Sequence, residues 1–150
     1  MKIEPYVSVN EFSFGDSQAE IRRKAMSPFR ESKIVIAGYT EWRDIFSDLK
    51  FAAFYDPSGK AIAFDFIDPD WVLGDKHWSK MTYNEILRFF QSNFNNVAVK
   101  GDSFTCQDLG ISISKSGSKR RAASGVFVYS HEYKKIPVPT PEEIIRDLLG

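Results

Sequence analysis

The stretch that begins the first expected helix reads SQAEIRR at residues 17–23, and a matching stretch reads TYNEILR at residues 82–88. Each places a hydroxyl residue three positions before a glutamate, which isoleucine follows directly. This spacing predicts a helix start, because the hydroxyl oxygen accepts a free backbone N–H and the glutamate carboxylate reaches back to the cap. Helices are therefore expected from Ser17 to about Met26, and from Thr82 onward.

Runs typical of strands follow each helix start, so the chain has the order of two helix-then-hairpin repeats, approximately residues 12–70 and 78–133. Helices interleaved with antiparallel hairpins predict an α+β fold. We expect one curved antiparallel sheet with the helices packed on one face. A chain of 150 residues favours a single domain over residues 1–150.

The most distinct local element is a hairpin at residues 51–67. Its first strand, at residues 51–55, is followed by the turn DPSG at residues 56–59. Proline presets the second turn position and glycine occupies the fourth. Alternation along the return strand predicts one face with Ile62, Phe64 and Phe66, and an opposite face with Ala61, Ala63 and Asp65.

Other segments are extended or ambiguous. Residues 110–114 alternate strictly, so one face of this strand is expected in the core, while Ser112 and Ser114 join Asp65 on the solvent side. Residues 38–50 fit both a helix and a strand. Strands are also expected at residues 6–14 (one long or two short), 33–37, 96–100 and 126–129.

The C-terminal segment carries a further helix start, TPEE at residues 140–143, with a cap, a proline at the first helical position and acids in the first turn. Residues 136–139 are expected to be extended because of their prolines. A helix over residues 140–149 would carry one apolar stripe, formed by Ile144, Ile145, Leu148 and Leu149. This stripe is expected to pack on the body of the protein or on another chain.

Composition excludes several classes of function. The chain has 20 basic and 20 acidic residues, so its net charge of zero gives no attraction toward nucleic acid or anionic membranes. The only cysteine, Cys106, cannot form an internal disulfide. The N-terminus has no apolar signal core, and no stretch approaches 18 apolar residues. We therefore expect a cytoplasmic protein with no membrane contact.

Candidates for catalysis are few. The two histidines, His77 and His131, lie in no recognisable motif, and the chain has no Gly-x-Ser-x-Gly sequence. A buried small side chain is the expected role of Cys106. We expect no enzymatic activity and no cofactor.

The densest acidic stretch, within residues 65–78, is the predicted partner-binding site. Its carboxylates lack the glycine and the terminal glutamate of a calcium loop, so no metal is expected. Fixed carboxylates can select a basic partner, and aromatic residues beside charges often anchor interfaces. The alternatives are a solvated loop for the acids and core packing for the tryptophans. The predicted site consists of Asp65, Asp68, Asp70, Trp71, Asp75 and Trp78.

The basic segment at residues 115–121, with Lys115, Lys119, Arg120 and Arg121, is opposite in charge. A short basic loop can contact phosphates. It has no interleaved aromatic residues to stack on bases, so a solvated loop tip is the simpler interpretation.

The order Phe12-Ser13-Phe14-Gly15-Asp16-Ser17, with Glu20 and Ile21 after it, resembles the entry of small bacterial domains in which a strand leads through a Phe-Gly turn into a Ser-x-x-Glu helix. Residues 108–111 and the strand at 126–129 are similar to the second half of such proteins. The resemblance covers most of residues 12–133. It implies a small helix–sheet domain of the kind found among immunity proteins of toxin systems, which act by binding and without cofactors.

The leading hypothesis is therefore a non-enzymatic protein-binding module, an immunity protein that neutralises a cognate bacterial toxin by direct binding. The zero net charge differs from that of acidic inhibitors of basic nucleases. The alternatives are a small-ligand-binding protein or enzyme with a site on the open sheet face, and a nucleic-acid binder that uses residues 115–121.

Overall fold

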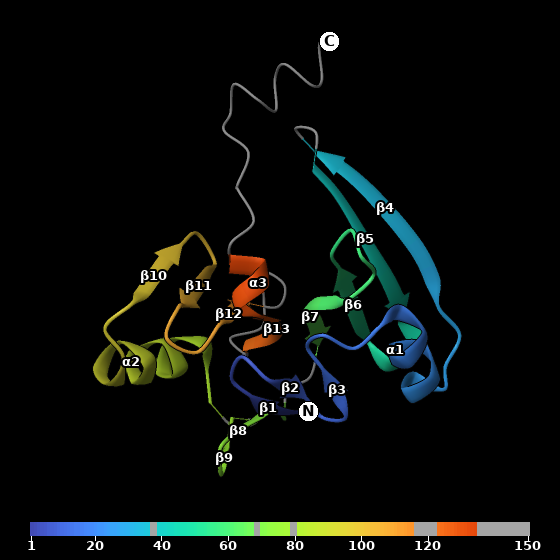
Figure 1. The fold of residues 1–150 in the computed structure, drawn as a ribbon. Coiled ribbons are helices and arrows are strands. Elements are labelled where there is room, and N and C mark those ends of the chain that lie inside the picture. The colour runs from blue at the N-terminus through green and yellow to red at the C-terminus, as the bar shows by residue number, and fades with distance from the viewer. Residues whose placement is uncertain (37–38, 68–69, 79–80, 116–122, 135–150) are drawn as a thin grey trace.

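The computed structural model describes residues 1–36, 39–67, 70–78, 81–115 and 123–134 (Figure 1). Within these ranges the fold is α+β, as predicted, and rich in strands, with three α-helices and two sheets in place of the one sheet expected. The helices are α1 (Gln18–Ala25), α2 (Tyr83–Asn93) and α3 (His131–Lys134). A short 3-10 helix, η1, covers Ser47–Leu49.

Eight antiparallel strands form the larger sheet in the order β10-β11-β12-β13-β7-β6-β5-β4. Four of them follow α1 in the chain and four follow α2, and consecutive strands pair within each set. The two sets meet where β13 pairs with β7. Their bounds are β4 (Arg30–Ile36), β5 (Tyr39–Phe46), β6 (Phe51–Tyr55), β7 (Ala61–Ile67), β10 (Val97–Lys100), β11 (Ser103–Cys106), β12 (Ile111–Lys115) and β13 (Ala123–Tyr129).

Both predicted helix starts are present, but only one is complete. At α2, Thr82 Oγ1 accepts the Glu85 N–H at 3.2 Å and the Glu85 carboxylate accepts the Thr82 N–H at 3.4 Å. At α1, Ser17 Oγ accepts the Glu20 N–H at 3.1 Å. The Glu20 carboxylate, however, pairs with Arg23 at 2.7 Å, so the predicted reach back to the cap is wrong at α1.

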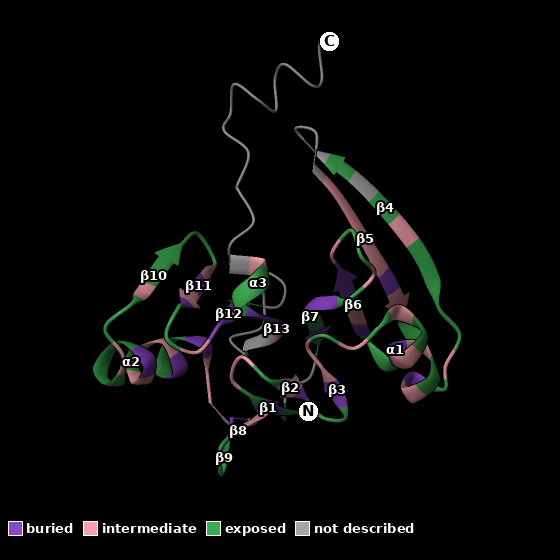
Figure 2. Cartoon of the chain, in the orientation of Figure 1, coloured by how far each residue is buried: buried purple, intermediate pink, exposed green. Residues whose placement is uncertain are grey.

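A smaller sheet lies with α1 and α2 on one face of the large sheet. The sequence did not predict this sheet as a unit. Its strands run in the order β3-β2-β1-β8-β9, with β1 (Lys2–Glu4), β2 (Ser8–Val9), β3 (Phe12–Ser13), β8 (Val72–Leu73) and β9 (Lys76–His77). Buried side chains of this sheet, α1, α2 and the large sheet form one core. Figure 2 shows the buried positions gathered there, while β4 and β10, at the sheet edges, are mostly exposed.

The short helix α3 lies on the opposite face, so the prediction that the helices share one face holds for α1 and α2 but not for α3. Tyr133 of α3 packs against Phe127 and Tyr129, with ring centroids 5.2 and 5.7 Å apart. These residues belong to a second apolar cluster that also contains Phe54 and Ile62.

The solvent side of the large sheet is largely as predicted. Ser114 and Asp65 are exposed, and Ser112 is half-buried and hydrogen-bonded to Thr105 at 2.6 Å. The strict alternation expected along residues 61–67 is interrupted, because the β6–β7 register shifts at Phe54 and Tyr55. Ile62 therefore packs in the second cluster rather than with Phe64 and Phe66.

Three local predictions are refined. The ambiguous segment 38–50 contains all of β5 and η1, and residues 6–14 form two short strands rather than one. The segment around Cys106 is itself a strand, β11, which the sequence analysis missed, and Cys106 is buried as expected. The expected helix at residues 140–149 lies outside the described residues. Within the described ranges, no helix has both the length and the apolar composition to cross a membrane.

Candidate functional site

The two tryptophans of the predicted partner-binding site lie in the core. Trp71 is 0% exposed and Trp78 is 2% exposed, and their rings stack 5.0 Å apart. Trp78 also packs against Phe90 of α2 at 5.5 Å. Neither indole presents a surface to a partner in this structure, so core packing, the alternative interpretation, describes their position.

The acids of that predicted site are divided between two regions. Asp70 and Asp75 are exposed beside the small sheet, and Asp70 lies 3.3 Å from His77 Nδ1. Asp65 projects from β7 on the solvent side of the large sheet, away from the core residues Phe64 and Phe66. Asp68 lies outside the described residues. In the part of the chain that is described, no group of three potential metal ligands occurs.

The histidines do not converge. His77 belongs to β9 and His131 to α3, and Figure 1 shows β9 at the bottom of the fold and α3 in its middle, beside β13. His131 instead stacks on Tyr6, with ring centroids 3.8 Å apart. The geometry therefore brings no pair of histidines to one site.

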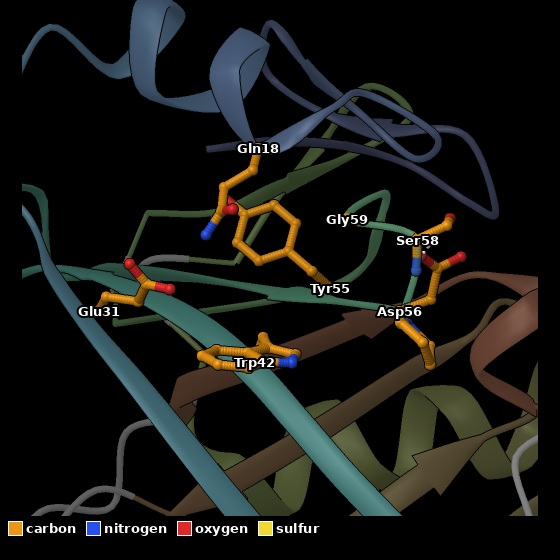
Figure 3. A pocket seen from close by; sticks show the side chains of 8 residues that line it. Gln18, Glu31, Trp42, Tyr55, Asp56, Ser58 and Gly59 are labelled. Carbon is orange, nitrogen blue, oxygen red and sulfur yellow. Dashed lines mark hydrogen bonds between the residues drawn. The ribbon is translucent and has the colours of Figure 1, made fainter.

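A cavity of about 360 Å³ opens beside the first turn of α1, between that helix, β4, β5 and the β6–β7 turn (Figure 3). None of the predicted partner-binding residues lines it. The lining residues are Gln18, Glu31, Trp42, Tyr55, Asp56, Pro57, Ser58 and Gly59. We take this cavity as the candidate site, and call it the α1 pocket.

A buried carboxylate fixes one wall of the α1 pocket. Asp44, on β5, is 0% exposed and accepts two hydrogen bonds from the Arg22 guanidinium, each 2.9 Å long. The Tyr55 hydroxyl donates to the same carboxylate at 2.9 Å, and Gln18 Nε2 lies 3.4 Å from it. A buried charge is stable only when paired and hydrogen-bonded in this way. These contacts, which we call the clamp, attach α1 to the sheet.

The clamp also fixes the protonation states of Tyr55 and Arg22. Burial, and then the Asp44 charge, raise the pKa of Tyr55 far above its ordinary value. The hydrogen bonds that Arg22 donates to Asp44 raise the pKa of Arg22, although burial partly opposes this rise. Tyr55 therefore remains a neutral hydrogen-bond donor and Arg22 remains a cation across the physiological range.

Two carboxylates face the α1 pocket with one oxygen each already engaged. Glu31 Oε2 accepts from Arg22 Nη2 at 3.2 Å. Asp56 Oδ1 accepts from the Ser58 N–H, the Ser58 hydroxyl and the Lys60 N–H, at 2.9, 2.7 and 3.0 Å. Burial alone would raise the pKa of Asp56, but these hydrogen bonds and the Lys60 charge together lower it. The second oxygen of each carboxylate takes part in none of these contacts.

Two aromatic rings complete the lining. Trp42 on β5 and Tyr55 on β6 are directly paired across the strands and both face the α1 pocket. Lys33, opposite Trp42 on β4, places its ammonium 5.0 Å from the centre of an indole ring of Trp42. The pocket therefore combines aromatic surface with carboxylate oxygens, which is a setting for cations.

Sequence reasoning missed this site because its residues come from four separated segments. A partial signal exists in residues 38–50, where Trp42, Asp44 and Phe46 alternate with period two. An aspartate between two aromatic positions of one strand face predicts a buried carboxylate, and such a carboxylate requires a cationic partner. The partner, Arg22, lies in the last turn of α1. Residue spacing does not indicate that this arginine meets Asp44.

A second cavity, of about 270 Å³, lies near Tyr6, Lys60 and His131 and shares Asp56 with the α1 pocket. Comparison with known proteins gives no further guidance, because no family model, curated protein or solved structure matches the chain. The function must therefore be inferred from the geometry.

Proposed function

We propose that the chain is a non-enzymatic protein-binding module of the immunity type, and that its partner, a cognate toxin, docks over the α1 pocket. The observation that carries the proposal is the pocket itself: an open cavity in which internal hydrogen bonds hold Tyr55, Glu31 and Asp56 in place. Groups fixed before binding lose little conformational entropy on binding, which favours affinity.

The chemistry of the pocket favours binding over turnover. Its two hydroxyl groups are both occupied as donors, Ser58 to Asp56 at 2.7 Å and Tyr55 to Asp44 at 2.9 Å. Activation of a hydroxyl nucleophile requires a base that accepts its proton near neutral pH. The raised pKa of Tyr55 and the lowered pKa of Asp56 oppose that transfer.

The acidic residues Asp65, Asp68, Asp70 and Asp75 remain predicted partner contacts. In the proposal they have a secondary role, since Asp65 and Asp70 lie on different sides of the large sheet. Exposed carboxylates around a docking surface mainly speed the approach of a basic partner.

We also propose that the two halves are copies of one unit, in which a capped helix precedes four antiparallel strands. Support comes from the matched cap spacing at Ser17 and Thr82, from the identical strand order after each helix, and from the pairing of the last strands, β7 with β13. In such an arrangement one copy can keep a structural role while the other acquires a binding site.

The test is binding to the protein encoded by the adjacent gene. We expect the purified pair to form a complex with a sub-micromolar Kd in calorimetry, and co-expression to relieve growth inhibition by the partner. The proposal would be overturned if the neighbouring product failed to bind, or if growth inhibition persisted despite binding.

A further inference from the structure

We propose that the α1 pocket receives the guanidinium group of an arginine side chain presented by the partner protein. The inference rests on the proposed function, because it specifies the chemistry of the contact that would hold the partner. It is carried by three independent features of the pocket: its shape, its free acceptors and a cation that already lies on its aromatic wall.

The shape of the pocket suits a planar group. Figure 3 shows Glu31 and Asp56 on opposite sides of the opening, with the Trp42 ring below Tyr55 and Gln18. The volume of about 360 Å³ falls in the lower part of the range for ligand sites, roughly 300–1,000 Å³. A planar guanidinium can stack on the face of the Trp42 ring, which a compact ammonium group cannot do.

The remaining carboxylate oxygens of the pocket suit the planar set of N–H donors of a guanidinium group. Glu31 Oε1 and Asp56 Oδ2 take no part in the hydrogen bonds that fix their partner oxygens. A guanidinium group offers five N–H donors in one plane, whereas an ammonium group is a compact, strongly hydrated charge with three. Acceptors placed on two sides of a ring therefore favour arginine over lysine.

The aromatic wall already attracts a cation. The Lys33 ammonium lies 5.0 Å from the centre of a Trp42 ring, within the distance at which cation–π attraction operates. Arg22, whose guanidinium contacts the pocket residue Glu31, is held by hydrogen bonds to Asp44 and Glu31. Of the described residues that line the pocket, Glu31 and Asp56 carry charge and both are anions, so both would attract an incoming cation.

The first experiment titrates the intact, ¹⁵N-labelled protein with N-acetyl-arginine-amide, and with the corresponding citrulline and lysine compounds as controls. Citrulline has nearly the same shape as arginine but no charge. We expect selective shifts at the Trp42 indole N–H and Gly59 with the arginine compound, and at least about tenfold weaker binding of citrulline, because charge-assisted hydrogen bonds are lost. Equal responses to all three compounds would overturn the inference.

Matched variants test the residues. Glu31→Gln should weaken binding of the arginine compound about tenfold, through loss of a charged acceptor. Lys33→Gln should strengthen it about two- to threefold, since a nearby like charge and a competitor for the ring are removed. Asp102→Asn, which also removes one carboxylate charge, lies outside the pocket at a side chain that is 86% exposed, and should leave the affinity unchanged. An Asp102→Asn effect as large as that of Glu31→Gln would mean that only net charge matters.

Partner binding separates this inference from the proposed function. If the partner binds the wild type and Glu31→Gln equally, the function stands and the arginine contact is wrong. If the arginine compound binds but no arginine-to-lysine change in the partner weakens the complex, the pocket serves a small guanidinium ligand, and the partner contact is overturned. Loss of partner affinity at one such arginine, matched by Glu31→Gln, is the expected result.

Discussion

The helices α1 and α2 begin with the same pattern of residues, yet they are attached to the sheet by different forces. α1 is held by the clamp, in which buried Asp44 binds Arg22 and Tyr55. α2 is held by rings: Phe90 packs on Phe104 at 5.2 Å and on Trp78 at 5.5 Å. The α1 pocket, with its carboxylates and half-buried indole, lies at the charged attachment.

The difference shows how the type of packing sets the possible function. Rings fill space from any direction, so a helix that docks through them leaves little room for a ligand. Charged groups must meet at fixed distances and angles. At the clamp, the side chains of Arg22 and Glu31 stay 29% and 48% exposed, so the surface beside the buried Asp44 remains polar. The α1 half therefore gains a binding site from the same contacts that stabilise it.

The largest expected effect comes from the ring attachment. Phe90→Ala should lower the free energy of unfolding by about 3–5 kcal/mol, as for other buried phenylalanines, because it leaves a cavity among Trp78, Phe94 and Phe104. Urea denaturation measures the loss. Val99→Ala, at a side chain that is 52% exposed in the same half, is the control and should cost less than about 0.5 kcal/mol.

Loss of the clamp should lower the free energy of unfolding nearly as much as Phe90→Ala does. Asp44→Ala leaves Arg22 and Tyr55 without their shared acceptor, and should cost about 3 kcal/mol, the lower part of the range for broken buried pairs, because Arg22 remains 29% exposed. Asp102→Ala removes a carboxylate that is 86% exposed and 4.0 Å from Lys115, and should cost less than about 0.5 kcal/mol. Similar losses in the two variants would contradict the assigned role of the clamp.

Local sequence patterns predicted much of the fold and little of the site. Both caps, the hairpin at residues 51–67 and the alternation at Ile111 and Ile113 depend on neighbours in the chain, so the sequence alone indicates them. The clamp joins residues 22 positions apart, and burial of Trp71 and Trp78 depends on the packing of α2. Such contacts follow from tertiary structure, which residue spacing does not specify.

Replacing the whole clamp should separate stability from binding. The triple variant Arg22→Met, Asp44→Leu and Tyr55→Phe removes both charges of the buried pair and the hydroxyl that donates to Asp44, and leaves only the half-exposed Glu31 without its partner. We expect it to lose only about 1–2 kcal/mol, less than Asp44→Ala alone, because buried ion pairs are often replaceable by apolar side chains. Binding of the arginine compound should weaken, since Glu31 loses the guanidinium that orients it. A triple variant less stable than Asp44→Ala would refute this view.

The caps should reveal a smaller difference between the halves. Thr82→Ala removes both the acceptor for the Glu85 N–H and a partner of the Glu85 carboxylate, and should cost about 1 kcal/mol. Ser17→Ala should cost less, because the α1 cap lacks the reciprocal contact. Thermal unfolding of both variants gives the comparison. A greater loss for Ser17→Ala would contradict the difference between the caps.

The smallest effects concern pH. Asp65 is exposed as a residue, but neighbouring groups remove part of the water around its carboxylate and raise its pKa, and the Arg43 charge offsets part of this rise. The folded protein therefore loses stability as pH rises through that pKa. The pKa of Asp56 is lowered, so its contribution is present at neutral pH and is lost as pH falls through the folded pKa. At pH 7, Asp65→Asn should slightly raise the Tm and Asp56→Asn should lower it. Both differences should shrink at acidic pH; persistence of either would contradict its assignment.

The most direct test of the contrast between the halves is ¹⁹F NMR of the protein labelled with 5-fluorotryptophan, compared in H₂O and D₂O. Three resonances are expected, and Trp42→Phe assigns the one in the α1 pocket. We predict a solvent isotope shift for Trp42 and none for the buried Trp71 and Trp78. A comparable shift at Trp71 or Trp78, or no shift at Trp42, would contradict an open, charge-held α1 half beside a sealed α2 half.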